Sequence, residues 1–222
     1  SREGYSFPVP DTYPVTLARG IQPVVSDGRM YVGTMQGTVH GIDVSDGRTL
    51  WSYDMGDPVI TTACADSDRV LFVDVYGDAV ALDAKTGVLA WQLTADRSIT
   101  PAPLLAGGMV YLASHSGTVY ALDWQSGKVM WERRLHAPIQ GEMAATRQRL
   151  FVPAEDMVVY ALALQSGELL AQKQVVGQSF RLRVSVYSYC VFPLSVTLTV
   201  ATSVQSSPGC PFLLSVRSSL KA

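Results

Sequence analysis

The feature of this sequence that most constrains its fold is an eleven-residue motif that recurs every forty residues. The motif reads GIDVSDGRTLW at residues 41–51, ALDAKTGVLAW at 81–91 and ALDWQSGKVMW at 121–131. A fourth copy, ALALQSGELLA, stays in register, with Ala163 in place of the aspartate and Ala171 in place of the tryptophan. A fixed period of this length is the signature of stacked supersecondary units, so the chain is predicted to be a repeat protein.

Each repeat contains the signals of four short strands. Apolar runs rich in β-forming residues predict one buried strand per repeat. They begin at Met30, Val70, Val110 and Leu150. Turn glycines follow, and segments such as TVYALD then alternate with the strand period of two. The segment around each tryptophan and an apolar segment ahead of each first run supply two more strands. Four antiparallel strands in forty residues leave no room for a helix, so we predict an all-β fold of β-propeller blades.

The recurrence of the same residues has a physical reason. A four-stranded blade has two apolar faces and buries both only when copies stack around an axis, so every copy needs the same buried groups. We predict that Trp51, Trp91 and Trp131 lie as wedges between neighbouring blades and do not form a stacking platform for a ligand. The aspartate of each motif is expected to accept backbone N–H bonds in an Asx turn that the glycine closes. These residues are Asp43, Asp83, Asp123, Gly47, Gly87 and Gly127.

The period divides the chain into three parts. We assign residues 1–19 to the end of a preceding blade, residues 20–172 to four full blades, and residues 173–222 to an aberrant or divergent tail. Closed propellers have about four to eight blades. Because residues 1–19 are assigned to a preceding blade, the prediction is an incomplete propeller of about four full blades with partial ends, and thus a fragment of a larger one.

The tail loses the repeat after Phe180. All 19 acidic residues lie at or before Glu168, and no charged residue lies between Val184 and Val216. Three interpretations are open. The first is a membrane span, which Pro193 and the strand-like alternation of SVTLTV disfavour. The second is a divergent edge blade, and the third is an out-of-frame translation of a region that should have continued the repeat. We favour a frameshift or truncation, because the register is lost abruptly.

Composition narrows the classes of function. The chain has 222 residues and a net charge of −2, so no basic excess predicts a nucleic-acid partner. Its three cysteines are too few for a disulfide scaffold and have no CxxC spacing, its three histidines lack metal-ligand spacing, and no G-x-S-x-G nucleophile elbow is present. We therefore assign no catalytic, cofactor-binding or metal-binding residue. The residues considered are Cys64, Cys190, Cys210, His40, His115 and His136.

The repeat resembles the pyrroloquinoline-quinone-type propeller repeat, also called the tryptophan-docking repeat. The resemblance rests on the pattern VYALDxxTGxxxW preceded by VYVGxxxG, and it covers about residues 20–172. It implies a propeller fold. This repeat class occurs in quinone-dependent alcohol and glucose dehydrogenases and in the propeller lipoprotein of the outer-membrane β-barrel assembly machinery, so the resemblance implies either an enzyme or an assembly factor.

The dehydrogenase alternative can be compared with the residues present. By resemblance, those enzymes clamp the quinone between a tryptophan and a disulfide of two adjacent cysteines. They also hold Ca²⁺ with an acidic residue and an asparagine, and use an aspartate as base. Here no two cysteines are adjacent and the sequence contains no asparagine. We therefore predict no cofactor, with pyrroloquinoline quinone and calcium as the alternative.

One surface stands out as a candidate for binding. The turn EDM, Glu155 to Met157, replaces the glycine turn of the other repeats, and His115, Glu155 and Asp156 occupy equivalent turns of neighbouring blades. A solvated turn is the simplest interpretation of these residues, but they would lie on one rim, where propellers commonly dock partners. We predict a non-enzymatic scaffold that binds a protein through a rim, outside the cytoplasm in the periplasm or cell envelope. Membrane association would come only through other segments or partners. The alternative is a fragment of a quinone-dependent dehydrogenase.

Overall fold

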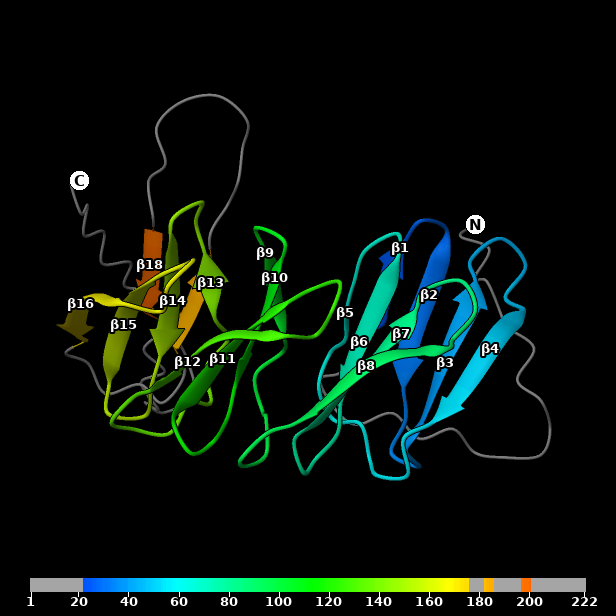
Figure 1. The fold of residues 1–222 in the computed structure, drawn as a ribbon, viewed down its shortest axis with the longest axis horizontal. Coiled ribbons are helices and arrows are strands. Elements are labelled where there is room, and N and C mark those ends of the chain that lie inside the picture. The colour runs from blue at the N-terminus through cyan, green and yellow to red at the C-terminus, as the bar shows by residue number, and fades with distance from the viewer. Residues whose placement is uncertain (1–21, 176–181, 186–196, 201–222) are drawn as a thin grey trace, which may run out of the picture.

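Residues 22–175 fold into four four-stranded antiparallel sheets that follow one another along the sequence. The computed structural model describes residues 22–175, 182–185 and 197–200. Each of the four sheets contains four strands in sequence order, joined by turns (Figure 1). The described part of the chain contains no helix.

The strand boundaries repeat from sheet to sheet. The first sheet contains β1 (Val24–Ser26), β2 (Arg29–Gly33), β3 (Thr38–Asp43) and β4 (Thr49–Asp54). The second contains β5 (Cys64–Ala65), β6 (Arg69–Val73), β7 (Asp78–Asp83) and β8 (Leu89–Thr94). The third contains β9 (Leu104–Ala106), β10 (Met109–Ala113), β11 (Thr118–Asp123) and β12 (Val129–Arg134). The fourth contains β13 (Ala144–Ala145), β14 (Arg149–Pro153), β15 (Val158–Ala163) and β16 (Leu169–Gln174).

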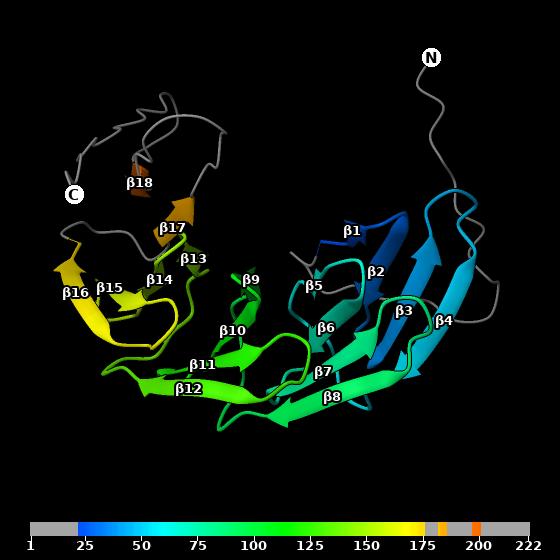
Figure 2. The same cartoon turned by 45° about the horizontal axis from the view of Figure 1, so that its top comes forward.

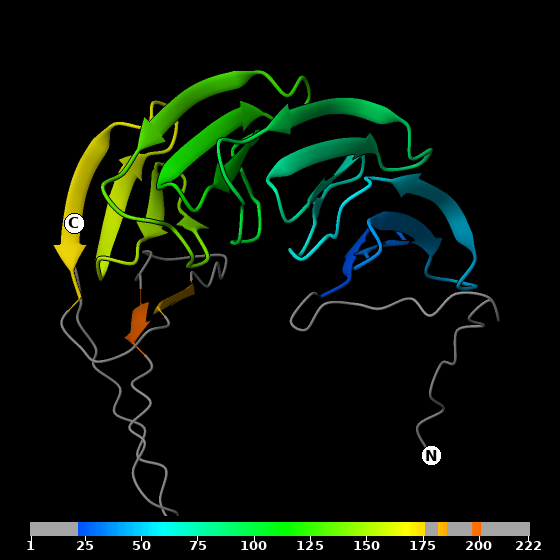
Figure 3. The ribbon, with the colours of Figure 1, turned by 90° about the horizontal axis from the view of Figure 1, so that it is seen from below.

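The sheets are arranged side by side along an arc, as blades of a propeller. The first strands β1, β5, β9 and β13 contact one another in turn and line the inside of the arc. The last strands β4, β8, β12 and β16 lie on its outside (Figures 2 and 3). The predicted all-β propeller of four-stranded antiparallel blades is therefore confirmed.

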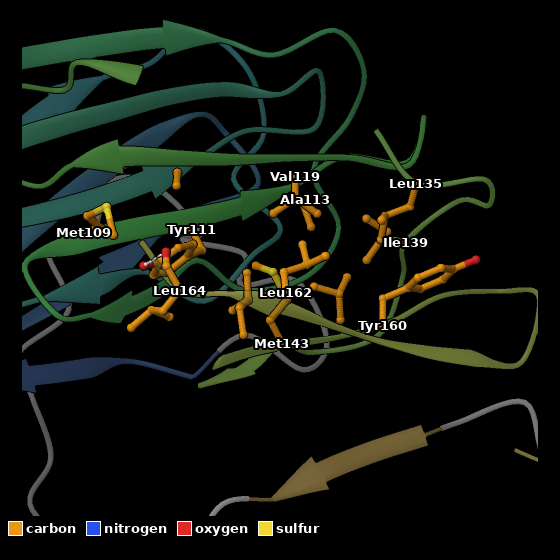
Figure 4. Packing of buried hydrophobic residues seen from close by; sticks show 13 residues of the cluster. Met109, Tyr111, Ala113, Val119, Leu135, Ile139, Met143, Tyr160, Leu162 and Leu164 are labelled. Carbon is orange, nitrogen blue, oxygen red and sulfur yellow. Dashed lines mark hydrogen bonds between the residues drawn. The ribbon is translucent and has the colours of Figure 1, made fainter. Parts of the chain in front are cut away.

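Three apolar clusters fill the spaces between successive sheets. Residues of β10 and β11 pack against β14 and β15 in one of them, with Tyr111, Ile139, Leu150 and Leu162 fully buried (Figure 4). Strand alternation produces this arrangement, because odd and even positions of one strand face opposite neighbours. On β6, for example, Phe72 belongs to the cluster shared with the first sheet, whereas adjacent positions belong to the cluster shared with the third.

Each repeat tryptophan lies across the gap to the next sheet. The indole N–H of Trp51 donates to the carbonyl of Ala84 at 3.2 Å, that of Trp91 to Trp124 at 3.0 Å, and that of Trp131 to Leu164 at 3.1 Å. The ring rests on the turn glycine of that next sheet: a Cβ on Gly127 would lie 2.5 Å from Trp91. The glycine therefore has two roles, since it also adopts a φ of 69°.

The aspartate of each motif forms the expected turn. Asp83 Oδ1 accepts the backbone N–H groups of Lys85 at 3.0 Å and Thr86 at 2.8 Å, and the Thr86 hydroxyl donates to the same oxygen at 2.8 Å. This hydroxyl bond is the main cause that holds the pKa of Asp83 below its usual value. The fourth repeat has Ala163 at this position, and its turn still closes through the bond from Gly167 N to the Ala163 carbonyl at 2.9 Å.

The two ends of the chain are described only in small part. Strands β17 (Leu182–Ser185) and β18 (Thr197–Val200) form a two-stranded antiparallel sheet. The assignment of residues 1–19 and most of the tail, with its three interpretations, lies outside the described residues. The domain boundaries at residues 20 and 172 remain predictions.

The inter-sheet tryptophan leads to a prediction about stability. Trp91→Ala should reduce the free energy of unfolding by about 3–5 kcal/mol, because it empties a large aromatic site and removes a buried hydrogen bond. His115→Ala, at an exposed turn, should change it by less than about 0.5 kcal/mol. Thermal and denaturant unfolding of the two variants checks this, and equal shifts would contradict the role assigned to Trp91.

Candidate functional site

One edge of the propeller, here called the turn rim, is built from two kinds of segment. The first kind is the turn between the second and third strands of each sheet, residues 34–37, 74–77, 114–117 and 154–157. The second kind is the connection that leaves the last strand of one sheet for the next sheet, residues 55–58, 95–98 and 135–138. Backbone hydrogen bonds join each connection to the turns on both sides. In the middle of the rim, Ala95 N donates to Gly77 O at 3.1 Å and His115 N donates to Ser98 O at 2.8 Å.

Three of the turns rest on a buried polar side chain. Thr34, Asp74 and Ser114 occupy the same repeat position and are almost completely buried. Asp74 Oδ1 accepts three backbone N–H groups, those of Tyr76, Gly77 and Asp78, each at 2.9 Å. Such a turn holds its tip in a fixed position, because its otherwise unpaired backbone donors are satisfied locally.

The fourth turn departs from the pattern in its backbone. Met157 stands where the other repeats have glycine and adopts a φ of 61°, in the left-handed region that side chains disfavour. Its side chain is 53% exposed, so burial does not offset this cost. The sequence identified this turn as unusual from the missing glycine, and the structure shows that the left-handed conformation is kept without it.

The three residues predicted for the rim divide into two groups. His115 and Glu155 are exposed at the tips of neighbouring turns, as the repeat register predicts. Asp156 instead turns its carboxylate inward, where it accepts the Tyr160 hydroxyl at 2.6 Å and the Val158 N–H at 3.0 Å. Burial, together with this bond to Asp156, raises the pKa of Tyr160 to about 12.

Sequence reasoning missed the apolar part of the turn rim. Met35, Tyr76 and Met157 are 38%, 67% and 53% exposed, and each lies at the tip of a turn. Only the comparison of turn tips across repeats could have found them, since they occupy different positions within their turns. Exposed apolar side chains on three of the four turns give this rim apolar area that a protein partner can cover.

A polar network joins the second and third sheets at the same rim. Asp96 Oδ2 accepts the hydroxyls of Ser116 at 2.5 Å and Thr118 at 3.0 Å, and Ser114 and Ser116 exchange a further hydroxyl bond at 2.8 Å. Partial burial acts to raise the pKa of Asp96, but these hydroxyl donors outweigh it and hold the pKa below its usual value. The network was not predicted, because its members come from separate segments.

The remaining candidates do not come together. His40 pairs with Ser52 through Nδ1 at 2.8 Å, and burial lowers its pKa. Cys64 is partly buried, and the loss of hydration raises the pKa of its thiol, whereas Cys190 and Cys210 lie outside the described residues. Within residues 22–175, 182–185 and 197–200, no group of three or more His, Cys, Asp or Glu side chains is placed to hold a metal ion. In the same part of the chain no helix is present that could cross a membrane.

Comparison with known proteins gives two kinds of relative. A family model described as outer membrane protein assembly factor BamB matches residues 12–105 and 95–203. A 1-butanol dehydrogenase (cytochrome c) from Thauera butanivorans is 32% identical over 122 residues, which is 46% of this chain and 18% of that protein. BamB from Moranella endobia is 27% identical over 107 residues, which is 41% of this chain and 26% of that protein.

A solved structure shares the fold. BamB from Moraxella catarrhalis superposes with a TM-score of 0.66 and 20% identity, over 80% of this chain and 57% of that one. The chain therefore spans only part of the length of each of these proteins.

Met157 leads to a second stability prediction. Met157→Gly should raise the free energy of unfolding by about 0.5–1 kcal/mol, because glycine adopts the left-handed conformation without a steric penalty. Met35→Gly is the matched control, because Met35 is also an exposed turn methionine but has no positive φ. This change should not raise the free energy of unfolding. Chemical denaturation of both variants checks this, and equal effects would show that φ is not the cause.

Proposed function

Because the chain belongs to the family of the outer membrane protein assembly factor BamB, we propose that it is a non-enzymatic platform that docks a protein partner on the turn rim. By analogy with that family, the partner is a component of outer-membrane protein assembly, and the chain acts outside the cytoplasm, in the periplasm or cell envelope. The likeness to solved structures supports the fold alone, so the partner and the compartment rest on family membership.

The observation that carries this proposal is the composition of the turn rim. Its exposed tips include Met35, Tyr76 and Met157, which offer apolar contact area. Its charged residues are mostly acidic, with Arg97 as the basic exception. The acidic residues at its surface are Asp57, Asp96 and Glu155, since Asp74 is buried and Asp156 turns its carboxylate toward Tyr160. An apolar surface within an acidic field favours a partner segment that is apolar and basic, because complementary charge speeds encounter and selects among partners.

The similarity to quinone-dependent enzymes supports a second candidate. A 1-butanol dehydrogenase is 32% identical over part of this chain, so the chain could belong to a longer dehydrogenase with its site elsewhere. The residues present do not supply the set that such a site requires by resemblance, because the sequence has no adjacent cysteines and no asparagine. No catalytic step is therefore assigned to this chain.

Site-specific photo-crosslinking tests the rim. A benzophenone amino acid placed at Tyr76 in the full chain, expressed in the cell envelope, should give one discrete adduct with an assembly component. The same probe at Val88 is the control, since Val88 is 64% exposed and Tyr76 is 67% exposed but Val88 lies away from the turn rim. The double variant Tyr76→Ser, Met157→Ser is tested with the probe at His115, because position 76 is then no longer free for the probe. The yield of the adduct from His115 should fall about tenfold or more.

Two results would contradict the proposed function. Equal adducts from positions 76 and 88 would show that the turn rim is not the docking surface. Dye reduction by the full-length natural protein, reconstituted with pyrroloquinoline quinone and calcium and given a primary alcohol, would establish the dehydrogenase instead.

A further inference from the structure

One repeat position explains why a pocket exists between the first and second sheets. On the third strand of each sheet, the residue that faces the preceding sheet is Tyr120 in the third and Tyr160 in the fourth, and both tyrosines are buried. The Tyr120 hydroxyl reaches the connection between sheets and accepts the N–H of Asp96 at 3.3 Å. The second sheet has Val80 at this position, paired with Gln92 across to β8 as Tyr120 is paired with Glu132. Valine is shorter by a phenol ring, so the corresponding gap is not filled.

The gap left by Val80 is a pocket of about 140 Å³ at the end of the strands next to the turn rim. Tyr53 and Asp54 line it from β4 of the first sheet, and Asp78, Gln92 and Thr94 line it from β7 and β8 of the second. Two carboxylates, an amide and a hydroxyl therefore converge beside one aromatic ring. Such a set is polar, acidic and suited to a group that donates several hydrogen bonds.

The carboxylates of this pocket have few donors in the described part of the chain. Asp78 Oδ1 is buried without a hydrogen-bond partner, and so is Asp74 Oδ2 at the other end of the same turn. Asp54 Oδ1 accepts the N–H of Gly56 at 2.9 Å. A buried carboxylate oxygen without a donor is costly, so the site favours a ligand that brings positive charge and N–H groups.

The third sheet shows how the same location is satisfied within the chain. There Thr118 stands in place of Asp78 and donates to Asp96 of the adjoining connection at 3.0 Å. The residue that corresponds to Asp96 beside the second sheet is Gly56, which has no side chain. The second sheet therefore has the acceptor Asp78 where the third has the donor Thr118. The side chain that would oppose it is missing, because Gly56 stands in the place of Asp96.

A larger hollow on the opposite edge does not share this property. It measures about 590 Å³ and is lined by residues that include Asp27, Arg29, Asp43 and Lys85. Arg29 and Asp27 form an ion pair at 3.0 Å, and Asp43 accepts donors from its own turn. Its charges are of both signs, and the side chains of Asp27, Arg29 and Asp43 have local partners, so its carboxylates do not require a charged ligand.

We propose that the pocket at Val80 binds the guanidinium group of an arginine on the protein partner. This inference rests on the proposed function, because it places the arginine on the partner that docks at the turn rim. A guanidinium is planar and carries five N–H donors, so it can bridge the carboxylates of Asp54 and Asp78 while its face lies on the ring of Tyr53. The pocket then sets the register of the partner on the rim, since it accepts one side chain at one place.

Small probes test the pocket without the partner. Acetyl-arginine amide is titrated into the full chain and followed by NMR, with acetyl-citrulline amide as the neutral probe of nearly the same shape. The arginine probe should bind with shifts confined to residues around Thr94 and Gln92, and the citrulline probe should bind at least about tenfold more weakly, because it lacks the charge.

Variants taken from the chain's own repeats then locate the binding. Asp78→Thr introduces the residue of the third sheet, and Val80→Tyr introduces the phenol that fills the gap in the third and fourth. Each should weaken the arginine probe by about tenfold or more. Asp68→Thr makes the same change of charge at an exposed position outside the pocket and should leave binding unchanged. Melting curves recorded alongside show that each variant is folded.

Three outcomes would overturn the proposal that the pocket binds an arginine side chain. These are equal binding of arginine and citrulline probes, unchanged binding in folded Val80→Tyr, and tight binding of Ca²⁺ at Asp78 in the absence of any arginine binding. The test is separable from that of the proposed function. Failure of the probes leaves the crosslinks at Tyr76 in place, whereas loss of those crosslinks leaves a pocket that still distinguishes arginine from citrulline.

Discussion

The contact between a tryptophan and the turn glycine of the following sheet is the interaction on which the rest of this structure depends. Each sheet is too thin to bury both of its faces, and the indole closes the gap to its neighbour with a large apolar ring and one hydrogen bond. The contact crosses repeats, so the glycine of one motif serves the tryptophan of the motif before it. This explains the fourth motif, where Gly167 is kept although Ala171 replaces the tryptophan: Trp131 of the third sheet rests on Gly167.

Most of the fold could be predicted from the sequence, because the forces that build a blade act on local patterns. The forty-residue period, the alternation within TVYALD and the turn glycines determine strands, hairpins and faces. The Asx turns at Asp43, Asp83 and Asp123 follow from the same short-range chemistry. These features require only residues that are neighbours in the chain or in the repeat.

The surface chemistry was less predictable, because it depends on segments that meet only after the blades stack. The hydrogen bonds of Asp96 with Ser116 and Thr118 join a connection to a turn of the next sheet. No spacing in the sequence predicts them. The inward turn of Asp156 toward Tyr160 likewise removed one carboxylate from the predicted rim. The pocket at Val80 becomes visible only when the facing side chains of successive sheets are compared.

The division between a uniform scaffold and a varied edge indicates where such a protein can hold its specificity. The positions that face neighbouring sheets are restricted to side chains of suitable volume, because a change there propagates into the stacking of two blades. The turn tips carry no such restriction, and residues as different as Met35, Tyr76, His115 and Glu155 stand at them. Val80 combines features of both kinds of position, since it faces a neighbouring sheet and lies next to the turn rim. The smaller residue leaves a pocket next to the rim, and we propose that a core-facing position thereby contributes to the binding surface.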